Sequence, residues 1–153
     1  MDAGFDAALG EMRAGRKRGH WIWYIFPQLS GLGSSGLAEM YGIDGRTEAI
    51  AYLHDPALRH RLLTIATTVA EYAKRGASLL ALMNSRIDVL KLVSSLTLFE
   101  AVGRELCESD EEPETLALAR AAAAVLDAAQ AEGYPRCPYT LEFLAHEPPG
   151  RTR

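Results

Sequence analysis

Few residues of this 153-residue chain belong to the types that mark secreted, metal-binding or membrane-spanning proteins. The two cysteines, Cys107 and Cys137, have no CxxC motif or Cys/His cluster beside them, so we expect reduced thiols and no metal site. No run reaches the ~18 apolar residues that cross a bilayer, which argues against a membrane partner. The first residues lack the basic and then apolar plan of a secretion signal, which predicts a cytoplasmic location.

A surplus of positive charge is also missing. Lysine and arginine total 16 against 20 aspartates and glutamates, giving a net charge of −4. We therefore expect no nucleic-acid partner, since general nucleic-acid binders carry a basic surplus. Positive charge is nevertheless concentrated locally, because five basic side chains fall within eight positions: Arg13, Arg16, Lys17, Arg18 and His20.

Motifs of the common catalytic classes are absent as well. The sequence contains no Gly-x-Ser-x-Gly, no His-Glu-x-x-His and no kinase signature. The glycine-rich stretch 31–36 lacks the Lys-Ser/Thr ending of a P-loop, so we interpret it as a connecting loop. The sequence accordingly predicts no cofactor.

Helical periodicity is what the chain does have. Apolar residues recur every three or four positions over 5–12, 37–41, 47–53, 58–72 and 85–106. A further helix is expected over 114–132, because nine of the fifteen residues from 117 to 131 are alanine. The fold class predicted is all-α: a compact single domain of about six to eight helices, two of them long. This domain is expected to span 1–147, with a flexible tail over 148–153.

The aromatic segment 19–29, Gly-His-Trp-Ile-Trp-Tyr-Ile-Phe-Pro-Gln-Leu, is the most unusual part of the sequence. Its composition favours a strand, but a strand there would have no partner. We therefore expect a buried helix that ends at Pro27. On a helix Trp21 and Trp23 occupy different faces, so one would be core and the other could line a cleft; on a strand they would share a face.

Together the aromatic segment and the basic cluster suggest a site for an anionic, planar ligand, held by ion pairing and stacking. In this interpretation Trp21 or Trp23 stacks on the ligand and His20 transfers protons. The alternative is that the aromatic rings are core, the arginines are solvated and His20 is structural. Further candidate ligand-binding residues are Arg13, Arg16, Gln28 and Tyr41.

A second polar group follows one face of the long helix, where Asp88, Lys91 and Ser95 recur at spacings of three and four. Apolar neighbours flank Lys91, which would suit it as a ligand clamp or a catalytic base. The alternative is an ordinary surface ion pair between Asp88 and Lys91. If one pocket unites both groups, then His20 and Lys91 are its candidate catalytic residues, and Asp88 and Ser95 are further ligand contacts.

Four blocks of the sequence resemble the family catalogued as domain of unknown function 1810. They are residues 11–29, 31–33, 41–43 and 88–99, of which the His-Trp-x-Trp to Pro-Gln block is the most specific. The resemblance covers about residues 5–118. It implies a compact, all-α bacterial fold and leaves the reaction open, because the family has no established one.

Two departures from the family's pattern stand out. Val93 occupies the position of a usual arginine, so Lys91 would have to meet a ligand's charge alone. The chain also begins after the family's usual opening helix, Pro-Tyr-Asn-Leu-x-Arg-Phe, whereas a similar segment, Pro-Tyr-Thr-Leu-Glu-Phe-Leu, stands at 138–144. We interpret residues 134–147 as that helix, relocated by circular permutation.

This interpretation makes a structural prediction. Tyr139, Leu141 and Leu144 should form one apolar face that docks beside the helix of residues 5–12. The alternative is a loosely attached extension, which the prolines around this segment would favour.

Two functions stay open. The first is a small-molecule-pocket protein, an enzyme or a former enzyme, that acts on an anionic heteroaromatic ligand such as a nucleotide or an ADP-ribose-like molecule. The second is a non-catalytic interaction module whose basic and aromatic surface docks a partner protein. The residue spacing decides neither whether the chain is an enzyme nor its oligomeric state.

Overall fold

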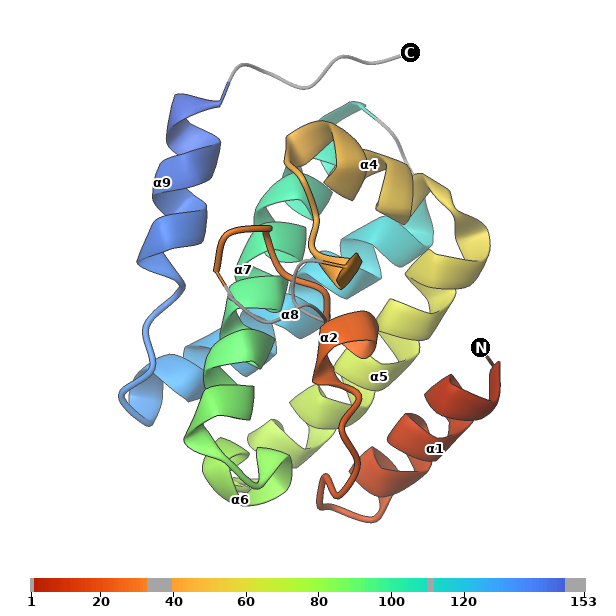
Figure 1. Ribbon diagram of the computed structural model, residues 1–153, viewed down its shortest axis with the longest axis vertical. Coiled ribbons are helices and arrows are strands. Elements are labelled where there is room, and N and C mark those ends of the chain that lie inside the picture. Colours follow the sequence, from red (N-terminus) through yellow and green to blue (C-terminus); the bar gives the residue numbers. More distant parts are fainter. Residues whose placement is uncertain (1, 33–39, 110–111, 148–153) are drawn as a thin grey trace.

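The computed structural model describes residues 2–32, 40–109 and 112–147, and these are mostly helical (Figure 1). Within them lie eight helices and no strand: α1 (Asp2–Arg13), α2 (Ile22–Ile25), α4 (Arg46–His54), α5 (Pro56–Lys74), α6 (Leu79–Met83), α7 (Arg86–Ser109), α8 (Pro113–Ala131) and α9 (Pro138–His146). The predicted all-α class is confirmed. The tail predicted at 148–153, and residues 37–39 of the helix predicted at 37–41, fall outside the described residues.

Three long helices, and not two, form the centre of the fold. α7 has 24 residues, and α5 and α8 have 19 each. α8 packs against both others, and its many alanines let their backbones approach closely. Every residue from Leu92 to Glu100 of α7 is buried, so this stretch is enclosed on all sides and is not amphipathic.

Side chains next to the helix starts fix where the helices begin. Asp55 accepts hydrogen bonds from the backbone N–H groups of Ala57 and Leu58, at 2.9 and 3.1 Å, ahead of Pro56 in the first turn of α5. The Ser85 hydroxyl accepts from the Asp88 N–H at 3.0 Å and caps α7. α6, which the sequence analysis missed, is capped by the Ser78 hydroxyl.

The aromatic segment is helical for only one turn. α2 spans Ile22–Ile25 and ends ahead of Pro27. Beyond it the chain is extended and pairs with residue 43: the Ile43 N–H donates to the Gln28 carbonyl, and the Ser30 N–H donates to the Ile43 carbonyl, both at 2.8 Å. This isolated bridge holds residues 40–43 beside the aromatic segment.

α9 does not replace an opening helix. It packs against α7, while α1 packs against α5 at the other side of the molecule (Figure 1). Leu144 is 7% exposed, but Tyr139 and Leu141 are 44% and 45% exposed, so the three side chains do not share a buried face. The docking predicted beside residues 5–12 is therefore wrong, and circular permutation is not supported.

The C-terminal segment is firmly attached all the same. The Arg136 guanidinium donates to both carboxylate oxygens of Glu100, at 2.8 and 2.9 Å. These bonds hold the pKa of Arg136 above its ordinary value. At the other end of α9, the buried Arg46 side chain donates to the Leu144 carbonyl at 3.0 Å, and its backbone N–H donates to the Glu147 carboxylate. A loose extension is thus not found either.

Replacing single leucines of α9 should separate its buried side from its exposed one. Leu144→Ala should lower the free energy of unfolding by about 2–3 kcal/mol, because a buried leucine leaves a cavity. The matched control Leu141→Ala should change it by less than about 0.5 kcal/mol. Denaturant titration measures both, and equal losses would contradict this packing.

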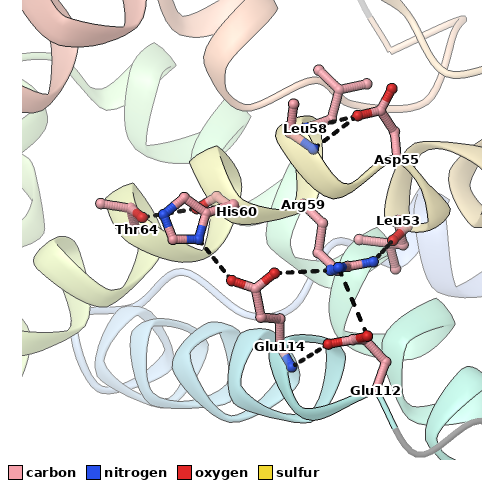
Figure 2. Close-up of polar contacts among 9 residues, drawn as sticks. Leu53, Asp55, Leu58, Arg59, His60, Thr64, Glu112 and Glu114 are labelled. Carbon is pink, nitrogen blue, oxygen red and sulfur yellow. Dashed lines mark hydrogen bonds and ion pairs between the residues drawn. The ribbon is translucent and has the colours of Figure 1, made fainter.

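An ionic cluster joins the start of α5 to the start of α8 (Figure 2). Glu114 accepts from His60 Nδ1 at 2.7 Å and from Arg59 Nε at 3.1 Å. Arg59 also donates to the Leu53 carbonyl at 3.1 Å and faces Glu112 at 3.8 Å. The bond from His60, with help from Arg59, lowers the pKa of the Glu114 carboxyl although its partial burial opposes this.

The cluster should make stability depend on pH in acid. Because the pKa of Glu114 is lower in the folded than in the unfolded chain, its stabilisation is complete above the unfolded value of roughly 4.3 and is lost as pH falls through the folded pKa. The free energy of unfolding should therefore decrease less steeply with falling pH in Glu114→Gln than in the unmodified protein, below roughly pH 4.3. Glu142→Gln, at an exposed position of α9, is the control and should leave the curve unchanged.

Candidate functional site

One carboxylate organises the loop between α1 and α2. Glu11 Oε1 accepts from the backbone N–H groups of Arg18 and Gly19, at 2.6 and 2.8 Å, and from Trp21 Nε1 at 2.9 Å. Burial raises the pKa of the Glu11 carboxyl, but these three bonds outweigh it and lower that pKa. Trp21 is thereby fixed in the core, 3% exposed, and is not a cleft residue.

Lys17 is the buried member of the basic cluster. Its ammonium pairs with Asp88 at 2.8 Å, donates to the Gly19 carbonyl and lies 4.9 Å from the centre of the Trp21 ring. Asp88 therefore pairs with Lys17 and not with Lys91, which corrects the pairing considered from the sequence. This ion pair ties the loop after α1 to the first turn of α7.

Lys91 and Trp23 meet on the other side of the aromatic segment. The Lys91 ammonium lies 4.7 Å from the centre of the Trp23 ring, a cation–π distance. Within the described ranges no carboxylate lies within ion-pair distance of it. The two side chains line a hollow of about 10 Å³, which we call the Trp23 hollow; its other walls are Ile22, Phe26, Gln28, Tyr41 and Gly42.

Two residues that line this hollow, Trp23 and Gln28, have side-chain polar atoms without a hydrogen-bond partner among the described residues. Trp23 Nε1 is buried, and no acceptor for it occurs in the part of the chain that the structure describes. The Gln28 side chain is 8% exposed and makes no hydrogen bond with another described residue. A buried donor left unsatisfied costs ~1–3 kcal/mol, so a ligand oxygen or a water that accepts these donors would be stabilising.

A larger cavity adjoins the Trp23 hollow, and Tyr41 and Gly42 line both. We call it the aromatic cavity; its volume is about 280 Å³. At its edge the half-exposed rings of Tyr24 and Tyr41 pack with centres 5.8 Å apart. The remaining walls are mainly apolar and come from α1, α2, α4, α5 and the 40–43 segment: Phe5, Ile25, Pro27, Met40, Ile43, Glu48, Tyr52, Leu58, Arg61, Leu62 and Ile65.

Tyr52 is a partly buried polar side chain in the wall of this cavity. Burial raises the pKa of its phenol well above the ordinary value, and the charge of Arg61 only partly offsets this. Tyr52 is therefore a neutral hydroxyl that can donate or accept a hydrogen bond. Its ring packs on Phe99 of α7, with centres 4.9 Å apart, which holds it in place.

The structure brings four of the predicted site residues together and leaves the others apart. Trp23, Gln28, Tyr41 and Lys91 line one hollow, from three separate segments. The predicted residues that line neither this hollow nor the aromatic cavity are Arg13, Arg16, His20, Trp21, Asp88 and Ser95.

These other residues have separate surroundings. Arg16 is exposed and donates to Asn84 Oδ1 at 3.0 Å. Arg13 and His20 are exposed. Ser95 is fully buried in α7, and its hydroxyl has no partner among the residues described.

Sequence reasoning missed most of the aromatic cavity. Its walls include Tyr24, Tyr52 and Arg61, which share no motif or regular spacing. The one available signal was the position of Tyr24 within the aromatic segment. Tyr52 lies in the short helix predicted at 47–53, to which the sequence gives no functional role.

The described residues contain neither a cluster of metal-binding side chains nor a membrane-spanning helix. No group of three or more His, Cys, Asp or Glu side chains there could hold a metal ion. No helix in the same residues is both long enough and apolar enough to cross a membrane.

Comparison with known proteins gives a family and a solved relative. A family model described as a protein of unknown function, DUF1810, matches residues 1–115. The crystal structure of the conserved hypothetical protein Rv1873 from Mycobacterium tuberculosis aligns with a TM-score of 0.77 and 36% identity over 95% of this chain and 91% of that one. No curated protein matches significantly. Because the match spans most of the chain and includes the walls of both the hollow and the cavity, the chain belongs to the DUF1810 family.

Proposed function

We propose that this protein binds a small anionic ligand with a planar aromatic part, in the Trp23 hollow and the adjoining aromatic cavity. The observation that carries the proposal is the position of Lys91. Its ammonium lies on the Trp23 ring beside the cavity, and within the described chain no carboxylate balances its charge. An arriving anion would form charge-assisted hydrogen bonds there, which are stronger than neutral ones.

A comparison of the two Lys–Trp contacts supports this assignment. Lys17 and Lys91 lie 4.9 and 4.7 Å from their tryptophan rings. Lys17 also has Asp88 at 2.8 Å, so its charge is already compensated within the fold. Lys91 is only partly buried and is thus the lysine placed to meet a ligand.

The size of the cavity limits the ligand. Its volume of about 280 Å³ is near the lower end of the ~300–1,000 Å³ range of small-molecule sites. A body of one or two rings suits this space, between the Tyr24–Tyr41 pair and the apolar walls of α5. A mononucleotide is one candidate, whereas an ADP-ribose-like molecule would extend beyond the cavity.

The proposed function is ligand binding, and Lys91 is the one predicted catalytic residue that lines this site. His20 lines neither the hollow nor the cavity, so the pair His20 and Lys91 is not assembled at this site. A base or Schiff-base role for Lys91 would need a ligand with an acidic proton or a carbonyl group beside it.

Binding can be tested by thermal shift with a panel of nucleotides, sugar phosphates and aromatic acids. A ligand at 100 times its Kd should raise the unfolding free energy by ~2.7 kcal/mol, or Tm by about 5–10 °C for a chain of this size. Lys91→Met keeps the apolar stem, removes the charge and should weaken binding at least tenfold.

The matched control is Lys74→Met, which removes an exposed lysine in the last turn of α5. It should bind like the unmodified protein. If no member of the panel stabilises the protein, or if both variants respond like the unmodified chain, the proposed function is wrong.

A further inference from the structure

We infer that the acidic group of the ligand is a carboxylate, with one oxygen seated in the Trp23 hollow between Trp23, Gln28 and Lys91. This inference rests on the proposed function and specifies its ligand class. The ligand would be an aromatic or otherwise flat monocarboxylate whose ring system lies in the aromatic cavity.

The size of the hollow points to a single oxygen. Its volume of about 10 Å³ is close to the ~10–15 Å³ that one water molecule requires. A carboxylate is flat and can place one oxygen there while its other oxygen faces Lys91. A phosphate monoester has three terminal oxygens in a tetrahedral arrangement, and only one of them fits this space.

The chemistry of the walls matches an acceptor. Trp23 and Gln28 bring N–H donors that have no partner within the described residues, and Lys91 brings a third donor with a positive charge. Carboxylate oxygens only accept hydrogen bonds, so these donors suit them. The side-chain amide oxygen of Gln28 is the one acceptor in this set, and rotation of the amide can turn it away from the ligand oxygen.

The charge of the walls favours a monoanion. Lys91 is the one cationic side chain among the residues that line the hollow in the described chain. Its single charge balances a carboxylate, whereas a phosphate monoester carries about −1.5 to −2 near pH 7. The lining of the aromatic cavity includes one acidic side chain, Glu48, and one basic side chain, Arg61, so it adds no net positive charge for a dianion.

The position of Tyr41 links the acid to the rest of the ligand. Tyr41 and Gly42 line both spaces, so the hollow and the cavity lie next to each other at these two residues. The bridge between Gln28, Ser30 and Ile43 fixes this junction from the backbone. A ring attached to the carboxylate would therefore meet the Tyr24–Tyr41 pair at the cavity's edge.

The experiment uses the full chain and three ligands that share one ring system: 2-naphthoate, 2-naphthamide and 2-naphthyl phosphate. Titration calorimetry should give 2-naphthoate a Kd at least tenfold lower than either of the others. In Lys91→Met the protein's preference for the carboxylate over the amide should fall to less than about threefold. The hollow then has no positive charge that distinguishes the charged carboxylate from the neutral amide. Trp23→Phe, which keeps a ring but lacks the N–H, should weaken both ligands alike.

A second measurement observes the Trp23 N–H directly in the unmodified chain and uses a variant only to assign its signal. The chain has two tryptophans, so its proton NMR spectrum has two indole N–H signals. Titration with 2-naphthoate should shift the Trp23 signal downfield and leave the signal of Trp21, whose N–H is bonded to Glu11, in place. The signal that is lost in Trp23→Phe belongs to Trp23, and the signal that remains belongs to Trp21.

The outcomes separate the two proposals. Tighter binding of 2-naphthyl phosphate, lost in Lys91→Met, would overturn the carboxylate while the proposed function stands. Binding of 2-naphthoate without a shift of the Trp23 signal would overturn this seat for its oxygen. Failure of every naphthyl ligand, with nucleotides bound in a Lys91-dependent way, would also overturn only the carboxylate, whereas failure of the whole panel overturns both.

Discussion

Enclosure of residues 92–100 of α7 on all sides is the constraint on which the rest of the structure depends. α8 covers it along its length, and α2, α4, α6 and α9 pack against it as well. Lys91 stands directly before the fully buried stretch 92–100, at the point where the helix leaves the core. The candidate site is therefore built on a rigid element, which keeps the Lys91 ammonium at a fixed place beside the Trp23 ring.

The two lysines near the aromatic segment show how a similar local contact can have different consequences. Lys17 and Lys91 each approach a tryptophan ring, but only Lys17 has a carboxylate partner. A buried ion pair of this kind fixes the loop geometry, because removing either partner would leave an uncompensated charge. Lys91 lacks such a partner in the described chain. This difference is the basis on which we propose that Lys91 meets a ligand, whereas Lys17 holds the loop after α1 in place.

The C-terminal part of the chain is not covered by the family model, but it packs on the core. α9 lies beyond residue 115, the end of that match, yet Arg136 bonds to Glu100 and the backbone N–H of Arg46 bonds to Glu147. No residue of α9 lines the hollow or the cavity. Its contribution is thus to cover α7 and to fix the start of α4, whose Glu48 and Tyr52 do line the cavity.

The sequence by itself determined the all-α class and the positions of the long helices, because periodicity, caps and local composition are properties of neighbours along the chain. It also separated Trp21 from Trp23, although it did not decide which one is core. Only the tertiary structure decided that Glu11 accepts a hydrogen bond from Trp21 and that Asp88 forms an ion pair with Lys17. It alone also decided that Tyr24, Tyr41 and Tyr52 line one cavity. These outcomes depend on contacts between segments far apart in the chain, which hydrophobic spacing and propensity do not encode.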